Sequence, residues 1–449
     1  MATGLSACQK KSSDKDEQGR TILIVSGYPS IEGKDKDNFD KRIKRFEEEK
    51  PDVVIKTDEW VFDLKTFYSK AAGKQLPTVF ETYFTEVSQC VESGYVADLT
   101  AALKKYGYEG RFNPYIEDMM SKDGKMYAFP YSAGLMGLAY NTDMFRKAGL
   151  MEKDGTPKQP KDWDEVVEFA VKIKEATGKP GIIFPTTKNN GGWIFSCLAW
   201  SYGVNFMEQD EDGKWKATFN TPETAEALQY IKDLKWKYDV LPAHNLIDYA
   251  EYYKIFATGG AGMMISNDMI ASNVVQYEME PNHVGMMGIP RGPKSHVSLI
   301  AGNTYMVSAT ATEDQIDAAI RWLKMSNDFN ATENFKTDKE KSIVRKVEKN
   351  QVVGIKGMSP WSDNTESVMF ERKLIDQYAN INPNHVRLYN EFVVKGEVEF
   401  RTEEPVCAQE LYATLDNCVQ EVLVNEKADC AAILEKANAD FQKNYLNNL

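Results

Sequence analysis

The chain has 449 residues, which is too long for one ordinary hydrophobic core and predicts at least two domains. Hydrophobic residues make up 42% and charged residues 27%, as in ordinary soluble proteins, and the net charge of -13 argues against nucleic acid or an anionic membrane as the main partner. The 4 histidines show no His-x-x-His or His-Glu-x-x-His spacing, so we expect neither a catalytic zinc site nor a cofactor.

The N-terminal residues resemble a lipidation signal. Residues 5–8 read Leu-Ser-Ala-Cys, similar to the bacterial lipobox, in which the cysteine is lipidated and becomes the mature N-terminus. The apolar region of a signal peptide is missing before it, which suggests that the chain starts inside that peptide. A polar run without apolar periodicity follows, as in a solvated tether. We interpret residues 1–19 as a signal-peptide remnant, lipobox and flexible tether, with Cys8 lipidated. An accidental match on a cytoplasmic chain is the alternative.

The cysteines after Cys8 show no pairing pattern. Three of them, Cys407, Cys418 and Cys430, are predicted to lie along one C-terminal helical stretch, where such spacings are too long for a disulfide. We expect these cysteines to be buried small hydrophobic residues.

The N-terminal part alternates between strands and helices. Strands are predicted at 21–25, 53–55 and 78–80, with amphipathic helices between them that end at Pro51 and Gly73. This alternation predicts a parallel, doubly wound sheet, in which ligands bind at the carboxyl ends of the strands. The candidate binding residues at those ends are Tyr28, Trp60, Glu81 and Tyr83.

The rest of the chain contains more helix. Asp162 and Thr221 have the sequence context of helix N-caps. Apolar runs at 263–265 and 284–289 predict further strands. Most of the chain after Asp338 is predicted to be helical.

Eight segments of the chain, in a fixed order, carry a family resemblance. They are 71–79, 92–100, 123–130, 138–150, 160–165, 256–264, 288–292 and 301–305. None is decisive alone, but in this order they resemble the family 1 extracellular solute-binding proteins, the maltose-binding-protein-like sugar receptors of ABC importers. One departure is Thr78, where the family usually has aspartate after the proline, and Glu81 is a candidate to replace that group.

The resemblance implies an α/β, periplasmic-binding-protein-like fold with two doubly wound lobes, three hinge crossings and a ligand cleft between the lobes. Lobe one would comprise residues 20–130 plus 289–328, and lobe two residues 131–288 plus 329–449. The crossings would lie near 130–131, 288–290 and 327–330.

A sugar presents paired hydroxyls and apolar C–H patches, so its site needs aromatic faces together with carboxylates and amides. Tyr131 follows the first crossing, where the family often places a ligand contact. Asn303 and Tyr305 are predicted to lie in a loop that faces the cleft. These three residues join the four candidates at the strand ends.

Lobe two contributes its own candidates. Trp193 is predicted to stand in a glycine-rich loop with little local packing. Asn267 and Asp268 follow a predicted strand, with a helix N-cap as the alternative. Trp361 and Asp363 are predicted to start a helix that closes over the ligand, and a core position is the alternative for Trp361.

Together these features predict the substrate-binding component of an ABC importer. We expect a non-enzymatic, extracytoplasmic monomer, anchored to the outer face of the bacterial membrane by Cys8. It would bind a carbohydrate, in particular an oligosaccharide, close on it by hinge motion and present it to the permease subunits. Three alternatives stay open: a receptor for a peptide or polyamine, a secreted glycoside hydrolase with two suitably spaced carboxylates, and an adhesive surface lipoprotein.

Overall fold

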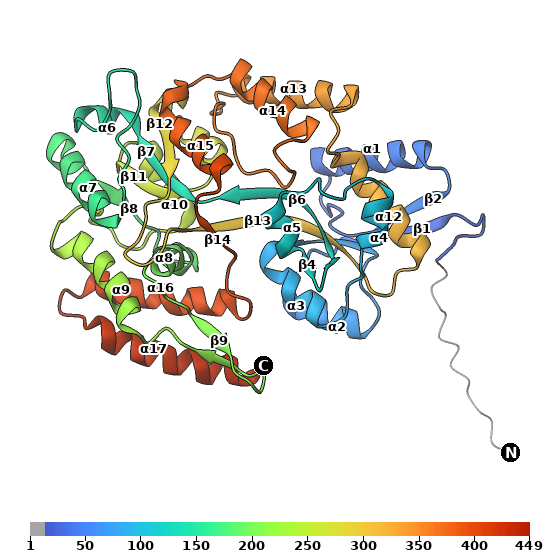
Figure 1. Ribbon diagram of the computed structural model, residues 1–449, viewed down its shortest axis with the longest axis horizontal. Helices are drawn as coiled ribbons and strands as arrows, with labels where there is room; N and C mark the ends of the chain where they lie inside the picture. The colour runs from blue at the N-terminus through green and yellow to red at the C-terminus, as the bar shows by residue number, and fades with distance from the viewer. Residues whose placement is uncertain (1–13) are drawn as a thin grey trace. The chain divides into compact units, whose positions relative to one another are not determined.

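The computed structural model describes residues 14–449, so the predicted lipidation site Cys8 lies outside the described residues. The described chain forms two compact units, each built from helices and strands (Figure 1). Unit 1 contains the chain up to Ser132, residues 302–329 and residues 360–362, and unit 2 contains residues 133–301, 330–359 and 363–449. The α/β class predicted from the sequence is confirmed for both units.

The unit boundaries differ from the lobe limits expected from the sequence. Residues 289–301 were expected in lobe one but belong to unit 2. The reason is that β13 (Val297–Val307) pairs at its first residues with β14 (Glu399–Arg401) of unit 2 and only its later residues belong to unit 1. Residues 360–362, expected in lobe two, belong to unit 1. The hinge positions themselves stay a prediction.

The sheet of unit 1 is built around three parallel strands. β1 (Thr21–Val25) pairs in parallel with β2 (Val53–Thr57) on one side and β3 (Val79–Tyr83) on the other. The unit 1 part of β13 runs antiparallel to β3, and β6 (Ala128–Leu135) pairs with β13. The strands at the start of the chain therefore form where the apolar, β-branched runs predicted them, and their carboxyl ends share one edge.

Helices cover the sheet of unit 1. α1 (Lys34–Glu49) packs against β2, and α12 (Glu313–Ser326) packs against β1. Phe46 of α1 and Trp322 of α12 meet edge to face, with ring centroids 5.3 Å apart. The other helices and the small hairpin strands of unit 1 are α2 (Leu64–Ala72), α3 (Val87–Glu92), α4 (Thr100–Lys105), α5 (Pro114–Met119), β4 (Ser121–Lys122) and β5 (Lys125–Met126).

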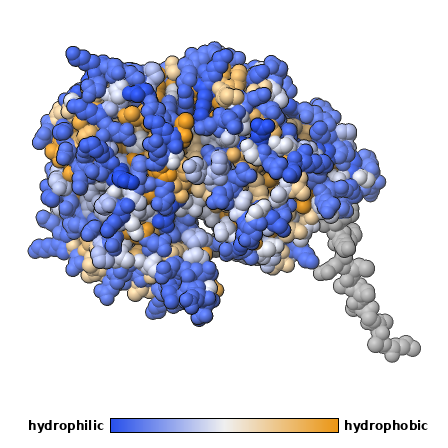
Figure 2. Space-filling model, viewed as in Figure 1, coloured by the Kyte–Doolittle hydropathy of each residue, from blue (hydrophilic) through white to orange (hydrophobic). Residues whose placement is uncertain are grey.

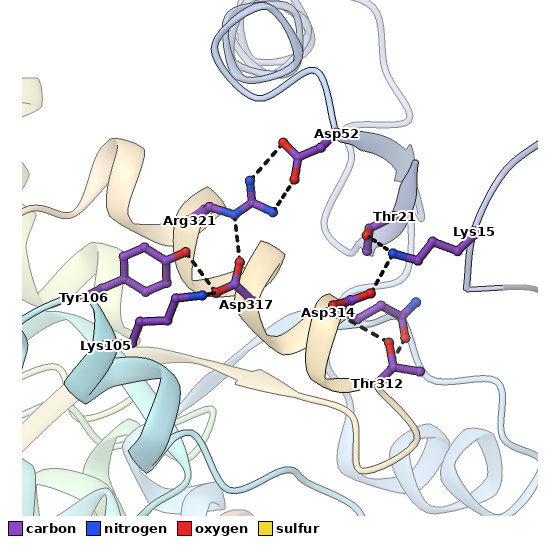
Figure 3. Close-up of polar contacts among 10 residues, drawn as sticks. Lys15, Thr21, Asp52, Lys105, Tyr106, Thr312, Asp314, Asp317 and Arg321 are labelled. Atoms are coloured by element: carbon purple, nitrogen blue, oxygen red, sulfur yellow. Dashed lines mark hydrogen bonds and ion pairs between the residues drawn. The ribbon is translucent and has the colours of Figure 1, made fainter. Parts of the chain in front are cut away.

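The segment before β1 is folded onto unit 1. The Asp16 carboxylate accepts hydrogen bonds from the backbone N–H groups of Gln18 at 2.9 Å and Arg20 at 2.8 Å, which closes a turn. Lys15 forms an ion pair of 2.6 Å with Asp314 at the start of α12 (Figure 3). Residues 14–19 were predicted to belong to the solvated tether. The structure instead gives them a defined turn, because Asp16 supplies the backbone with acceptors.

A second group of charges fixes α12 to its neighbours (Figure 3). Arg321 pairs with Asp52 at 2.8 Å and with Asp317 at 3.0 Å. The Asp317 carboxylate also accepts a hydrogen bond of 2.9 Å from the Tyr106 hydroxyl and pairs with Lys105 of α4. Because several charges share one network, it contributes more than an isolated surface pair would.

Unit 2 has a mixed sheet in the order β12-β7-β11-β8. β7 (Gly137–Asn141) runs antiparallel to β11 (Met263–Ser266) and to β12 (Val284–Gly288), while β8 (Ile182–Ile183) is parallel to β11. The two apolar runs predicted as strands in this region are β11 and β12. A separate hairpin joins β9 (Met207–Gln209) to β10 (Trp215–Ala217).

Both predicted helix caps of unit 2 are confirmed. Asp162 caps α7 (Trp163–Thr177) by accepting a hydrogen bond of 2.9 Å from the Glu165 N–H. Thr221 caps α9 (Pro222–Trp236). The remaining helices of this unit are α6 (Thr142–Lys147), α8 (Asn190–Ser201), α10 (Tyr249–Ala257), α11 (Ile270–Asn273), α13 (Glu333–Glu348), α14 (Glu366–Gln377), α15 (Arg387–Lys395), α16 (Ala408–Val424) and α17 (Cys430–Asn444).

The C-terminal cysteines do not lie along one helical stretch, as the sequence suggested. Cys407 precedes α16, Cys418 lies within it and Cys430 begins α17, which packs back against α16. A new helix starts after Asp429, whose side chain caps α17 by accepting hydrogen bonds from the N–H groups of Ala431 and Ala432. All five cysteines of the described chain are free thiols, and only Cys407 is not buried.

The surface in Figure 2 is mainly hydrophilic, with hydrophobic residues scattered over it. Among the helices of residues 14–449, none combines the length and apolar character needed to cross a bilayer.

Candidate functional site

Four of the predicted site residues lie together in unit 1, and we call Glu81, Tyr131, Asn303 and Tyr305 the strand-end cluster. Glu81 accepts a hydrogen bond of 2.9 Å from Asn303 Nδ2 and another from the Tyr131 hydroxyl. The Tyr131 and Tyr305 rings stack with their centroids 4.6 Å apart and 30° between their planes. All four side chains are half-buried, so the cluster keeps access to solvent.

Strand register brings the cluster together. Tyr305 stands opposite Glu81, and Asn303 stands opposite Tyr83, in the antiparallel pair of β13 and β3. Residues two apart on a strand share one face of the sheet. Asn303 and Tyr305 are therefore strand residues, which corrects the predicted loop, and Glu81 and Tyr83 lie within β3 rather than after it.

Gly302 lets β6 approach β13 closely enough to bring Tyr131 into this group. A Cβ atom at Gly302 would lie 2.3 Å from the backbone oxygen of Ser132. The Asn303 N–H also donates a hydrogen bond of 3.2 Å to the Ser132 hydroxyl. A larger residue at position 302 would separate the strands and remove Tyr131 from Glu81.

The chemistry of the cluster follows from its protonation. Burial and the hydrogen bond to Glu81 raise the pKa of Tyr131, and burial raises the pKa of Tyr305. Both phenols are therefore neutral at physiological pH and keep their O–H donors. The cluster combines two aromatic rings, one carboxylate and one amide.

Arg42 of α1 borders the strand-end cluster, and sequence reasoning missed it. Its guanidinium carbon lies 4.1 Å from the centroid of the Trp322 ring. It also lies beside the Tyr305 hydroxyl, where its charge opposes the effect of burial on the pKa of Tyr305. Arg42 is one of many charged residues on α1. Only the packing of α12, distant in sequence, distinguishes it from the others.

Tyr28, Trp60 and Tyr83 lie at the expected edge of the unit 1 sheet. The Tyr28 hydroxyl donates a hydrogen bond of 3.0 Å to Asp40, and Trp60 Nε1 donates one of 3.1 Å to the Thr66 hydroxyl. Tyr83 is 51% exposed. Tyr28 and Trp60 are thus held by local partners and remain half-buried, whereas the Tyr83 ring is open to solvent.

In unit 2, Asn267 and Asp268 follow β11, as predicted. Asn267 is buried, and its side-chain oxygen accepts a hydrogen bond of 3.0 Å from the Met269 N–H, so it serves the local turn before α11. Burial raises the pKa of Asp268 to about 6. Within residues 14–449, no side chain forms a hydrogen bond or ion pair with the Asp268 carboxylate. This carboxylate is free to accept hydrogen bonds from a ligand.

Two glycines frame the Asp268 carboxylate. A Cβ atom at Gly357 would lie 2.3 Å from Asp268 Oδ2, and one at Gly134 would lie 3.2 Å from Oδ1. The backbone therefore approaches both carboxylate oxygens closely, and side chains at these two positions would displace them.

Trp193 stands in the first turn of α8, not in a loop, which corrects the sequence interpretation. The neighbouring glycine has a packing role, because a Cβ atom at Gly192 would lie 2.2 Å from the backbone oxygen of Tyr412 in α16. Asp416 of α16 accepts a hydrogen bond of 2.7 Å from the Gly192 N–H. The Trp193 Nε1 atom is buried and has no hydrogen-bond acceptor in the described part of the chain. The centroids of the Trp193 and Tyr249 rings lie 6.4 Å apart.

Trp361 and Asp363 do not join the other candidates. Trp361 is 8% exposed and stacks on Phe112 with ring centroids 5.0 Å apart, next to Tyr108 and Phe129. This is the core position that the sequence left as the alternative. Asp363 pairs with Arg372 at 2.7 Å. The predicted helix start at these residues is also displaced, since α14 begins at Glu366.

Comparison with known proteins relates residues 32–326 to one family, described as bacterial extracellular solute-binding protein. YcjN of Escherichia coli strain K12, whose name places it among ABC transporter periplasmic-binding proteins, is 26% identical over 347 residues. That match covers 73% of this chain and 76% of YcjN. The arabinooligosaccharide-binding protein of Bacillus subtilis strain 168 is 25% identical over 276 residues, or 60% of this chain and 59% of that protein.

Solved structures share the fold. The cyclic alpha-maltosyl-1,6-maltose binding protein from Arthrobacter globiformis superposes with a TM-score of 0.66 at 20% sequence identity. The match covers 96% of this chain and 100% of that protein. At this identity the likeness establishes the two-lobed, maltose-binding-protein-like architecture and says nothing about the ligand.

Proposed function

The chain belongs to the bacterial extracellular solute-binding protein family, and from this membership we propose that it binds a carbohydrate, in particular an oligosaccharide, and delivers it to its transporter. The family consists of substrate-binding receptors that work outside the cytoplasm with ABC importers. This protein is therefore a solute-binding component of such an importer, and the carbohydrate is the proposed part.

The strand-end cluster is the observation that carries the proposal. Stacked tyrosine rings offer apolar faces to the C–H patches of a sugar ring. Beside them, Glu81 Oε1 accepts from Tyr131 and Asn303, which leaves Oε2 to accept a hydrogen bond from a sugar hydroxyl, and the Asn303 amide can donate and accept. This combination suits a polyhydroxylated ring better than a peptide or a polyamine. The Bacillus subtilis relative described above is named for an arabinooligosaccharide, which supports the same ligand class.

We propose that Asp268 and Trp193 of unit 2 are also ligand-binding residues. Asp268 offers an unpaired carboxylate, and Trp193 offers an indole N–H without an acceptor in the described chain. Because binding favours the conformation that makes the most contacts with the solute, we propose that binding drives a hinge motion.

A panel of mono- and oligosaccharides, screened by thermal shift and confirmed by calorimetry, tests this function. We expect at least one oligosaccharide to raise the melting temperature and to bind with measurable heat. Small-angle scattering should show compaction with that sugar. If only peptides or polyamines bind, the carbohydrate proposal fails, and release of reducing sugar by the purified protein would indicate a hydrolase instead.

We further propose that the protein is anchored through a lipid on Cys8, supported by the lipobox-like residues 5–8. When the protein is expressed in bacteria behind a complete lipoprotein signal peptide, it should partition into detergent, and the Cys8→Ala variant should appear in the soluble fraction. Equal partitioning of both forms would contradict the anchor. One lipid binds membranes only marginally, so the measurement needs gentle washing.

A further inference from the structure

Arg42 lacks the partner that the other partly buried arginines of residues 14–449 have. Each of the others pairs with a carboxylate oxygen. These pairs are Arg20–Asp16 at 2.8 Å, Arg321–Asp52 at 2.8 Å, Arg372–Asp363 at 2.7 Å and Arg401–Glu404 at 3.4 Å. Arg42 instead has only neutral partners: it donates a long hydrogen bond of 3.4 Å to the backbone oxygen of Trp322 and lies within hydrogen-bonding reach of the Tyr305 hydroxyl. No carboxylate in the described chain lies within ion-pair distance of it.

The surroundings of Arg42 offer donors and no anion. Arg42 Nε is buried and has no acceptor among residues 14–449, and the same holds for Trp322 Nε1. The two side chains lie against each other, with the guanidinium carbon 4.1 Å from the indole ring centroid. Two unsatisfied donors therefore stand side by side, and one of the two side chains, Arg42, lies beside Tyr305 of the strand-end cluster.

Such an arrangement costs free energy in the empty protein. Removing a guanidinium from water without a counter-ion is unfavourable, and the attraction to the Trp322 ring offsets only part of that cost. Glu81 does not supply the missing charge, because it forms no ion pair with Arg42 and is not among the groups that shift the pKa of Arg42. An acceptor that arrives with the ligand would recover the cost.

We propose that Arg42 forms a subsite for a negatively charged group of the solute, either the carboxylate of a uronic acid or the phosphate of a sugar ester. The inference rests on the proposed carbohydrate function and makes it more specific. A carboxylate or phosphate matches the planar guanidinium with two parallel hydrogen bonds and cancels its charge. A neutral hydroxyl would leave the buried charge uncompensated.

Calorimetry with matched probes tests the subsite. The probes are digalacturonate and trigalacturonate, the neutral galactose oligomers of the same linkage, and galactose 1-phosphate. We expect an anionic probe to bind the wild-type protein at least about 10-fold more tightly than its neutral counterpart. Arg42→Met should weaken anionic binding by about 100-fold, and Arg42→Lys should weaken it less. Arg45→Met is the matched control, because Arg45 lies on the same helix and pairs with Glu49 at the surface.

A structural role for Arg42 predicts different results. Because Arg42→Met removes an unpaired charge, its melting temperature without ligand should not fall below that of the wild type. If Arg42→Met fails to fold, the salt dependence of probe binding to the wild-type protein tests the subsite instead. About 0.5 M salt should weaken the binding of an anionic probe to the wild-type protein and leave a neutral sugar unaffected.

The outcomes separate the two proposals. Neutral oligosaccharides that bind as well as or better than the anionic probes, or that lose as much affinity in Arg42→Met, would overturn the anion subsite and leave the carbohydrate function intact. Binding of none of the probes, while non-sugar solutes bind, would overturn both. Anionic binding that is lost in Arg42→Met and retained in Arg45→Met supports the subsite.

Discussion

The Tyr131→Ala variant is expected to bind the cognate carbohydrate about 100-fold more weakly than the wild-type protein. The substitution removes the ring that stacks on Tyr305 at 4.6 Å and the hydroxyl that donates to Glu81. A tyrosine at the centre of a binding site typically contributes at least about 2 kcal/mol, and about 2.7 kcal/mol corresponds to a 100-fold change. Isothermal calorimetry with the sugar identified by the screen measures this loss.

Tyr131→Phe separates the two contributions. It keeps the ring and removes the hydroxyl that donates to Glu81. We therefore expect a smaller loss of affinity, about 10-fold, which corresponds to the free energy of about one hydrogen bond to a charged group. The control is Tyr115→Ala, because Tyr115 belongs to unit 1 and is 49% exposed. Unchanged affinity in Tyr131→Ala, with a melting temperature near that of the wild type, would show that the strand-end cluster is not the binding site.

The Asp268→Asn variant is expected to be more stable than the wild-type protein at neutral pH and to bind the solute less well. Burial raises the pKa of Asp268 from 3.8 to about 6 in the folded protein. Two pKa units correspond to about 3 kcal/mol, so ionisation of Asp268 costs the fold up to that amount. The charge of Lys346 offsets part of the cost, and that of Glu371 adds to it.

The sign of this effect gives it a characteristic pH dependence. Well below pH 3.8, Asp268 is protonated in the folded and unfolded states alike, and the variant gains nothing. As the pH rises from 3.8 to about 6, the carboxyl ionises in the unfolded chain but not yet in the fold, so the wild-type protein loses stability relative to the variant. Above about pH 6 both states are ionised and the difference stays constant. Urea unfolding at about pH 4 and pH 8 should show a much larger difference at the higher value. Asp440→Asn, on the exposed side of α17, should show no such difference.

An equal stability of Asp268→Asn and wild type at both pH values would mean that the carboxylate is not destabilised in the fold. A gain in stability together with a loss of binding is the pattern expected of a residue that the fold keeps for its ligand.

Local sequence signals predicted the elements that local physics controls. Asp162 caps α7 because its side chain reaches an N–H three residues later, and no distant residue is needed for that. The run at 21–25 forms β1 because it is apolar and β-branched. The strand ends then follow from the parallel topology, which explains why Glu81 and Tyr83 could be predicted at that edge.

Tertiary packing decided what the sequence left open. Trp361 sits in a chain segment typical of a loop, but Phe112 and Tyr108 stack against its ring. The glycines before Trp193 favoured a loop, although Gly192 is needed because α16 approaches α8. Arg42 could not be recognised, because the burial of its guanidinium depends on Trp322, which lies far along the chain.

The turn at Asp16 and the ion pair of Lys15 with Asp314 fix this part of the chain to unit 1. They therefore shorten the segment that would separate the folded protein from a lipid on Cys8. Asp14, where the described chain begins, lies six positions after Cys8, and a chain of that length reaches at most about 20 Å. With a lipid on Cys8, the receptor would search a thin layer above the bilayer instead of the whole extracellular volume. Its effective concentration at the permease would then be set by this reach rather than by its abundance.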